Sequence, residues 1–268
     1  MTLFFVVAHK PAPIPQKPGF VPVLVGKKDF TLPGAVRDDA GENIAQKNPS
    51  YCELTAQYAM WKNPPFAADY VGLAHYRRYF TTRRFSADPR FFLDGDTAEQ
   101  ALQNADVLLA APRYFSCTVG ENYYRYGAGK QKDLEQTERI IQEKYPAYHD
   151  AFRRVTGRNH ASYYNMFVMS RSHFEAYCAW LFDVLFTLEE RTDLSGYTPA
   201  QRRIFGYLSE ILLNVWVETN HLRIRYMPVA ETEAPGHYAV SYLRKQAVQW
   251  KHRISYRVRR LGYKKGET

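Results

Sequence analysis

Residues 69–80 read DYVGLAHYRRYF, an apolar run that leads directly into an imidazole and two guanidinium groups. The run over residues 70–74 is short and apolar, which predicts a buried strand. Ligands of open α/β sheets bind beyond the carboxyl ends of the strands. His75, Arg77 and Arg78 follow this strand, and a guanidinium fork pairs with phosphate oxygens through two hydrogen bonds. We therefore expect a diphosphate site here, with a basic surface cluster as the alternative.

The surrounding sequence alternates short apolar runs with longer helical patterns. This alternation is typical of an α/β domain in which a mixed central sheet is flanked by helices. The other predicted strands cover residues 3–8, 21–25, 107–111, 163–169 and 223–228.

Three helix starts are predicted from polar N-cap residues followed three positions later by Glu or Gln, a pairing that satisfies free backbone N–H groups. Residues 112–129 show no clear period and predict a long loop beside the ligand site. The helix starts are Ser50 with Glu53, for a helix through Trp61; Asp96 with Glu99; and Thr198 with Gln201, for a helix to about Asn220.

The net charge of +9 is confined to the end of the chain. Nine Lys or Arg and no acidic residue lie between Tyr242 and Lys265, and the remaining 27 basic residues match the 27 acidic ones. A neutral body argues against a broad nucleic-acid-binding face.

The basic segment, residues 239–268, has the pattern of an amphipathic helix attached to a domain of residues 1–238. Its apolar residues recur in steps of four and three, at Leu243, Ala247, Trp250, Ile254, Val258 and Leu261. Such a helix can lie in an anionic membrane surface, with Trp250 buried and Lys251, Arg253 and Arg257 on the head groups. A final helix docked on the body, its charges merely solvated, is the alternative.

Other sequence features indicate a cytosolic protein. Cys52, Cys117 and Cys178 lie too far apart for a metal knuckle or a disulfide framework and are read as reduced packing residues. The opening apolar run lacks a basic start and is too short for a signal peptide. No stretch approaches the roughly 20 apolar residues that span a bilayer.

A polar segment, residues 37–55, precedes a predicted helix whose free N–H groups point at whatever binds there. It supplies Asp39, Asn43, Lys47 and Tyr51 as candidate ligands of a phosphate or a sugar. A solvated loop that ends in an ordinary helix cap is the alternative, and spacing alone favours it.

Several motifs in fixed order resemble a bacterial family of capsule and O-antigen glycosyltransferases long catalogued as a domain of unknown function. They are NI at 43–44, KN at 47–48, YCELT at 51–55, WKN at 61–63, GLAHYRRYF at 72–80, YNMFVM at 164–169 and RIFGYLSE at 203–210. The resemblance spans most of the body.

This resemblance implies a GT-A-like nucleotide-sugar fold. It also implies a UDP-sugar donor, with galactose or galactofuranose preferred, and a lipid-linked glycan acceptor in capsule or O-antigen synthesis. The protein would then work as a peripheral enzyme at the inner face of the cytoplasmic membrane.

The resemblance also bears on metal dependence. GT-A enzymes commonly carry an Asp-x-Asp metal motif after a central strand, whereas this strand ends in His75-Tyr76-Arg77. Fixed cations can stabilise a leaving diphosphate as a metal does. We expect His75 and the two arginines to replace the metal, although Mn²⁺ or Mg²⁺ remains an alternative. The one Asp-x-Asp, Asp94-Gly95-Asp96, is assigned to a helix cap.

Glu210 is the candidate catalytic carboxylate, because a glycosyl transfer needs a group that takes the proton of the acceptor hydroxyl. It flanks the predicted buried face of the helix that follows Thr198, next to Tyr207, while Glu53 and Asp39 are further candidates. A solvated helix glutamate is the alternative. Asn165, Tyr207 and Glu53 are expected to contact the sugar or the acceptor.

Two other classes of function remain open. A nucleic-acid-binding protein would use the basic tail for phosphates and tyrosines for stacking. A non-catalytic scaffold of a polysaccharide assembly complex would carry a vestigial site.

Overall fold

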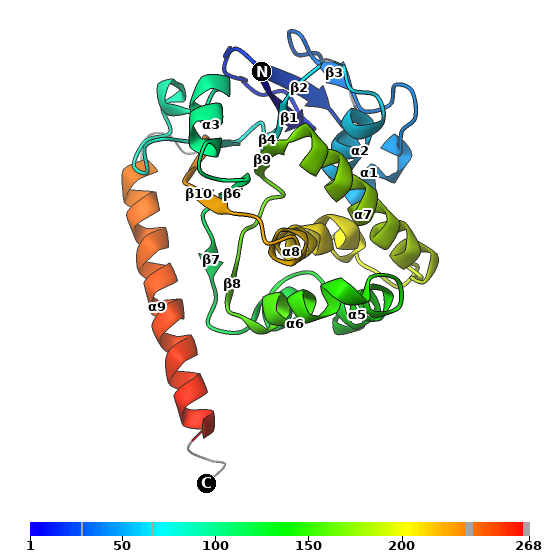
Figure 1. Cartoon of the computed structure of the whole chain (residues 1–268), viewed down its shortest axis with the longest axis vertical. Helices are drawn as coiled ribbons and strands as arrows, with labels where there is room; N and C mark the ends of the chain where they lie inside the picture. Colours follow the sequence, from blue (N-terminus) through cyan, green and yellow to red (C-terminus); the bar gives the residue numbers. More distant parts are fainter. Residues whose placement is uncertain (28, 66, 234–237, 265–268) are drawn as a thin grey trace.

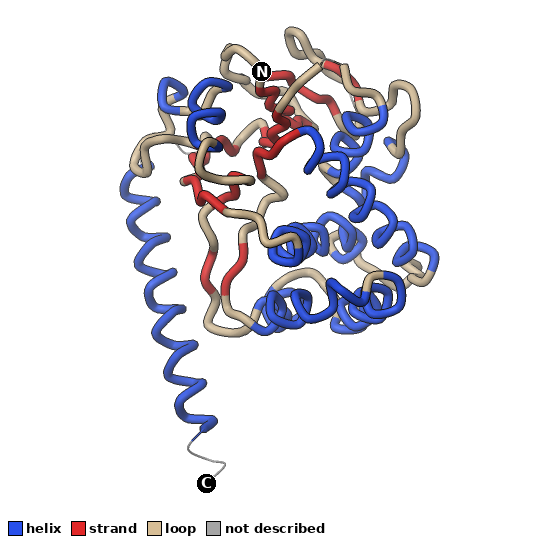
Figure 2. Tube along the Cα trace, viewed as in Figure 1, coloured by secondary structure: helices blue, strands red, loops and turns tan. Residues whose placement is uncertain are grey.

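The computed structural model describes residues 1–27, 29–65, 67–233 and 238–264, and the side chains of its last helix as far as Arg259. A mixed sheet forms the centre of the body, and helices cover its faces (Figures 1 and 2). The predicted α/β class and layer arrangement are therefore confirmed.

The main sheet has the strand order β10-β6-β9-β4-β1-β2-β3, with β5 paired to β4 and β11 paired to β5. Neighbouring strands run parallel except that β9 is antiparallel to both β4 and β6, and β5 is antiparallel to β4 and β11. Strands β7 and β8 form a separate antiparallel ribbon. The bounds are β1 Thr2–Ala8, β2 Phe20–Leu24, β3 Val36–Arg37, β4 Tyr70–His75, β5 Arg78–Phe80, β6 Val107–Ala110, β7 Arg113–Tyr114, β8 His160–Ala161, β9 Phe167–Ser170, β10 Ile224–Met227 and β11 Val229–Glu231.

The long helices α7 and α8 and the short helix α2 pack on one side of the sheet, while α3 packs on the other. The bounds are α1 Asn48–Tyr51, α2 Leu54–Lys62, α3 Gly95–Leu102, α4 Val119–Glu121, α5 Gln131–Lys144, α6 His149–Gly157, α7 Arg171–Glu190, α8 Ile204–Thr219 and α9 Tyr238–Lys264.

Alternation along β1 divides the core between the two faces of the sheet. Leu3 and Phe5 belong to the larger cluster, whereas Phe4 and Val6 belong to the cluster on the α3 side. Successive strand side chains point to opposite faces, so both faces of β1 are buried.

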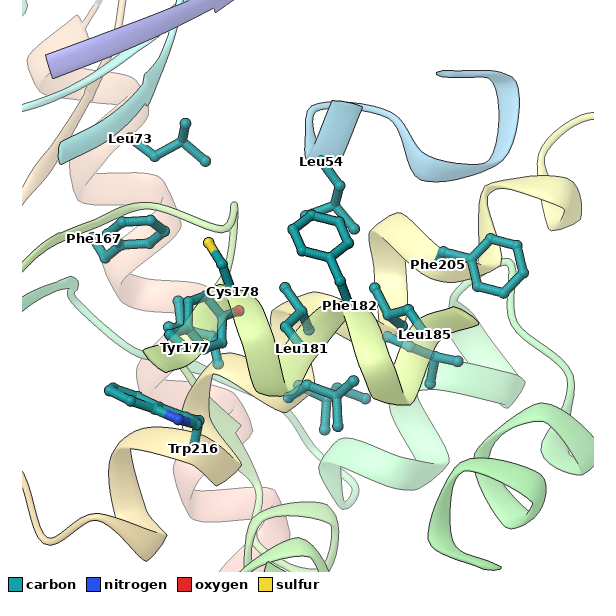
Figure 3. Close-up of a cluster of buried hydrophobic side chains, with 14 of the residues drawn as sticks. Leu54, Leu73, Phe167, Tyr177, Cys178, Leu181, Phe182, Leu185, Phe205 and Trp216 are labelled. Atoms are coloured by element: carbon teal, nitrogen blue, oxygen red, sulfur yellow. The ribbon is translucent and has the colours of Figure 1, made fainter. Parts of the chain in front are cut away.

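Helix α7 carries the centre of the larger cluster. In Figure 3, its Tyr177, Cys178 and Leu181 lie among side chains of the sheet and of α8, including Phe167 and Trp216. Cys178 is fully buried and reduced, as predicted for a packing residue.

The predicted strands at 3–8, 21–25, 70–74, 107–111 and 223–228 are confirmed to within one residue at each end. The strand predicted at 163–169 is wrong at its start, because β9 begins only at Phe167. Tyr164 and Asn165 have φ values of 78° and 52°, and this left-handed conformation is incompatible with a strand.

The capping box predicted at Thr198 is confirmed. Gln201 N donates to Thr198 Oγ1 at 3.3 Å, and Thr198 N donates to Gln201 Oε1 at 3.1 Å. A 3₁₀ turn, Gln201–Arg203, follows and leads into α8, which ends at Thr219.

The other two predicted helix starts are wrong. A residue with φ 55°, Cys52, interrupts the expected helix between α1 and α2, and Ser50 Oγ donates to the Lys47 carbonyl instead of capping. Helix α3 is capped by Asp94, which accepts from Thr97 N at 3.1 Å, and not by Asp96. This agrees with a capping role for the Asp-x-Asp motif.

The segment at 112–129 is more regular than the predicted loop. It contains β7, the short helix α4 and a π-helical turn, Asn122–Tyr126.

Helix α9 runs alongside the body next to β7, and its carboxyl end extends beyond it (Figure 1). The residues that dock it on the body recur in steps of three and four. Gln249 accepts from the Tyr114 backbone N–H, His252 Nδ1 donates to the Tyr114 carbonyl at 2.9 Å, and Tyr256 OH donates to the Gly157 carbonyl at 3.1 Å.

The apolar stripe of α9 is displaced by about two residues from these contacts, which is about 200° around a helix. It therefore faces away from the body: Trp250 is 65% exposed and Ile254 is 50% exposed, and Leu243, Ala247 and Val258 are also exposed. The side chains of Arg260, Leu261 and Lys264, and the whole of Lys265, lie outside the described part of the chain. None of the described helices combines the length and the apolar character needed to cross a bilayer.

Candidate functional site

Tyr164 and Asn165 form a left-handed corner that joins three candidate side chains. The corner lies between β8 and β9, at the carboxyl end of the neighbouring strand β4. Left-handed conformations cost free energy in residues other than glycine and cluster at functional sites. The backbone strain at this corner therefore indicates a candidate functional site.

Glu210, on α8, is fixed to the corner through the backbone. Tyr164 N donates to Glu210 Oε1 at 2.6 Å. Burial, and secondarily the negative charge of Glu53, raise the pKa of Glu210 to about 8. A carboxyl group with this pKa can both accept and release a proton near neutral pH.

Glu53 is fixed to the same corner through a side chain. Asn165 Nδ2 donates to Glu53 Oε1 at 2.7 Å and to Ser209 Oγ at 2.8 Å. The Asn165 side chain is buried, and its Oδ1 has no hydrogen-bond partner among the described residues. The two carboxylates thus lie on either side of one corner, each held by a different residue of it.

His75, the last residue of β4, is also bonded to the corner. Its Nε2 lies 2.6 Å from the Tyr164 carbonyl, which can only accept, so Nε2 carries the proton. Burial lowers the pKa of His75 below its usual value. His75 is therefore neutral at neutral pH, with Nδ1 as its acceptor nitrogen, and its expected part in replacing a metal stays a prediction.

Arg78, on β5, is one of the cations that the structure brings to this cluster. Its guanidinium carbon lies 4.4 Å from the centre of the Tyr164 ring, and its charge opposes the rise in the pKa of Glu210. Its Nε is buried and has no hydrogen-bond partner among the described residues. An N–H in this state is available to a ligand oxygen.

Arg77 lies in the turn between β4 and β5 and pairs with a different carboxylate. Its Nη1 donates to Glu233 Oε2 at 3.1 Å. The two arginines that were expected to act together therefore have different surroundings.

Tyr207, on α8, adjoins the carboxylates. Burial raises its pKa, with Glu210 and Glu53 among the further causes. The Arg203 guanidinium carbon lies 5.1 Å from the centre of the Tyr207 ring, so Arg203 is an additional cation at this end of α8.

Four other candidates lie in different surroundings. Arg37 binds the Asp39 carboxylate, and Asn43 Nδ2 donates to the Gly41 carbonyl at 2.8 Å. Asp39 and Asn43 therefore stabilise the loop in which they lie. Lys47 and Tyr51 both bond to Glu189, at the end of α7. Tyr51 is fully buried and therefore has no surface for a ligand in this structure.

Sequence reasoning missed Arg113, Tyr164 and Arg203. Arg113 lies 5.9 Å from the centre of the Tyr164 ring, and its charge also opposes the rise in the pKa of Glu210. Tyr164 and Arg203 begin the motifs YNMFVM and RIFGYLSE, but the three residues lie far apart in the chain and their spacing indicates no particular chemistry. A positive φ at Tyr164 leaves no clear signal in a tyrosine-rich sequence.

Among the described residues, no cluster of three or more His, Cys, Asp or Glu has a geometry that could hold a metal ion.

The chain is similar to known proteins in two comparisons. A family model described as a domain of unknown function, DUF4422, matches residues 4–221. The solved apo structure of the WbbM bifunctional glycosyltransferase aligns with a TM-score of 0.79 and 28% sequence identity. The alignment covers 87% of this chain and 45% of that one, so this chain spans less than half the length of WbbM. No curated protein sequence matches the chain.

Proposed function

This chain belongs to the DUF4422 family, and from that premise we propose that it is a glycosyltransferase that moves a sugar from a nucleoside diphosphate donor to an acceptor hydroxyl. Similarity to a protein named as a bifunctional glycosyltransferase supports this class of reaction.

The placement of Glu210 is the observation that carries the proposal: its Oε1 accepts from Tyr164 N at 2.6 Å, at the corner that also binds Glu53, and partial burial there raises its pKa to about 8. A general base acts best when its pKa lies near the working pH, because it is then strong enough to take a proton and is still substantially ionised. Glu210 takes the proton of the acceptor hydroxyl as that oxygen bonds to the anomeric carbon, and the bond from that carbon to the diphosphate breaks. Glu53 keeps the pKa of Glu210 high by its charge.

Arg78 stabilises the leaving diphosphate. Charge develops on the phosphate oxygens as the bond breaks, and a preoriented cation acts most strongly in a site that excludes water. Arg78 is already ordered against Tyr164 and has a free buried N–H. Neutral His75 serves as a positioning residue, since its bond to the Tyr164 carbonyl fixes the corner that holds Glu210. We propose that these fixed groups replace a divalent metal.

The finer assignment rests on the sequence resemblance. We infer a GT-A-like arrangement, a UDP-sugar donor that carries galactose or galactofuranose, and a lipid-linked glycan acceptor in capsule or O-antigen synthesis. Asn165, Tyr207 and Glu53 are the proposed contacts to the sugar or the acceptor.

Helix α9 is the proposed membrane contact. Its exposed apolar stripe, with Trp250 and Ile254, is flanked by exposed Lys251 and Arg257. This combination suits the interface of an anionic bilayer. The Arg253 guanidinium carbon lies 3.8 Å from the centre of the Tyr114 ring, so Arg253 also packs on the body. Its contact with a head group stays a prediction.

The purified protein should release UDP from one of a panel of UDP-sugars when a lipid-linked acceptor is present. The same rate with a chelator is expected, because arginines carry the role of a metal. Loss of the rate with chelator and its return with Mn²⁺ would overturn the metal-independent proposal. An absence of UDP release across donors and acceptors, with metal supplied, would favour the non-catalytic scaffold.

A further inference from the structure

A second pair of cations lies at the carboxyl ends of two adjacent strands. Strands β1 and β4 are parallel, with Val7 opposite His75. Lys10 follows the end of β1 by two residues, and Arg77 follows the end of β4 by two residues. Parallel neighbours end at the same edge, where ligands of such sheets bind.

A single carboxylate, Glu233, joins these two cations. Lys10 Nζ lies 3.3 Å from Glu233 Oε1, and Arg77 Nη1 lies 3.1 Å from Oε2. Each oxygen thus has its own cation, as two oxygens of one phosphate group would. Hydrogen bonds from Lys10 and Arg77 lower the pKa of Glu233, which is therefore ionised at neutral pH.

Tyr76 holds the two cations at a fixed place. Its buried ring lies 5.3 Å from Lys10 Nζ and 5.8 Å from the Arg77 guanidinium carbon, measured to the ring centre. His9 meets the ring edge-on at 5.2 Å. Partial burial lowers the pKa of His9, and the charges of Lys10, Arg77 and Arg203 lower it further. Lys10 and Arg77 therefore both lie close to this imidazole.

The charges at this edge are not balanced by Glu233 alone. Lys10 and Arg77 carry two positive charges, and the carboxylate carries one negative charge. Ion pairs of half-exposed side chains contribute little to stability, because water screens them. A phosphate with more charge and more acceptor oxygens forms stronger, charge-assisted hydrogen bonds with the same cations.

We propose that Lys10 and Arg77 form a phosphate subsite, that Glu233 occupies it when no donor is bound, and that the diphosphate of the donor displaces Glu233. The inference rests on the proposed function, because it assigns the subsite to the same donor. Arg78 then binds the diphosphate from the carboxylate side, while Lys10 and Arg77 bind it from the β1 side.

The test is a calorimetric titration of the full chain with inorganic pyrophosphate, which lacks the base and the sugar of a donor. Glu233→Gln keeps the shape of the side chain and removes the competing charge, so it should bind pyrophosphate about 3- to 10-fold more tightly than the wild type. Lys10→Gln should bind it about 10-fold more weakly.

The matched control is Glu143→Gln. Glu143 pairs with Arg191 at 2.7 Å, and the exposed fractions of that pair, 53% and 38%, resemble the 49% and 37% of Glu233 and Arg77. Glu143→Gln should leave the affinity for pyrophosphate unchanged, and circular dichroism confirms that each variant is folded.

Affinity of Glu233→Gln equal to or below that of the wild type would overturn the displacement, and wild-type affinity of Lys10→Gln would overturn the subsite. The two proposals fail separately. Tighter binding by Glu233→Gln without any UDP release would keep the subsite and remove the glycosyltransferase, whereas UDP release with unchanged pyrophosphate binding would do the reverse.

Discussion

Charged side chains usually lie at the surface of a protein and large apolar ones in its core. The carboxylate cluster of the body departs from the first rule, and the exposed apolar stripe of α9 departs from the second. In the body, Glu210 and Glu53 are partly buried around one corner. On α9, Trp250 and Ile254 face outward while polar side chains make the contacts with the body.

Neither arrangement favours the stability of the isolated fold. Burial of a carboxylate raises its pKa and costs free energy, and exposed apolar side chains forgo burial. Each region therefore lowers the stability of the fold at the place where we propose that a ligand or a membrane surface binds.

The largest expected effect tests whether the buried carboxylate is catalytic. Glu210→Gln should lower the turnover of UDP-sugar by about 100-fold or more, because removal of a general base costs 10²- to 10⁴-fold. In the wild type, kcat/KM should rise with pH toward about 8, where Glu210 loses its proton. Steady-state rates across pH 5.5 to 9 measure both.

Glu218→Gln is the control on the same helix, because Glu218 pairs with Arg154 and Arg158 away from the corner. It should retain wild-type turnover. Full activity of folded Glu210→Gln would show that the carboxylate cluster of the body is not catalytic.

A smaller effect tests whether Arg78, whose Nε is buried, binds the donor. Arg78→Gln should weaken UDP binding by roughly 10- to 100-fold, since a hydrogen bond to a charged group contributes about 1.5–3 kcal/mol. Calorimetric titration with UDP measures this loss. Arg90→Gln is the control, because Arg90 is exposed and pairs with Asp88, and unchanged UDP affinity of Arg78→Gln would remove Arg78 from the donor site.

The cost of the buried carboxylate can be measured directly. The pKa of Glu210 is about 8 in the folded protein and ordinarily 4.5, so its contribution to stability is present below 4.5 and is lost as pH rises toward 8. Between pH 5 and pH 8.5 the wild type should lose about 2 kcal/mol of unfolding free energy relative to Glu210→Gln, because part of the full shift is screened. Urea unfolding at both pH values gives the difference, and parallel pH dependence of the two proteins would contradict it.

The smallest effect concerns α9. Ile254→Asp should lower binding to anionic vesicles by about 10-fold, because it removes roughly 1.5–3 kcal/mol of apolar burial from the interface. Turnover of a soluble acceptor analogue should not change. Gln246→Asp adds the same charge at another exposed position and should bind almost as the wild type does. Equal vesicle binding of both variants would show that the stripe does not enter a membrane.

Much of the fold was predictable because its signals are local. Apolar runs predicted β1, β2, β4, β6 and β10 to within one residue. The Thr198 capping box was predictable for the same reason. The fold also agrees with the glycosyltransferase structure it resembles, at a TM-score of 0.79.

The site was predictable only in part, because it depends on contacts between distant segments. The roles assigned to Glu210 and Asn165 stay predictions, although both side chains do reach one corner. The neutral state of His75 follows from burial, which a strand pattern does not reveal at its last residue. The pairing of Glu233 with Lys10 joins residues more than two hundred positions apart, and no spacing rule predicts it.

The hydrogen bonds that Gln249 and His252 of α9 form with the Tyr114 backbone affect how an acceptor would reach the site. A helix of 27 residues is about 40 Å long, and its docked face fixes it to β7. If α9 lies flat on a bilayer, this bond gives the whole body one orientation, with the site at a constant height above the lipid. The proposed lipid-linked acceptor would then reach the protein by lateral diffusion, so encounters would depend on acceptor density per unit of membrane area instead of its concentration in volume.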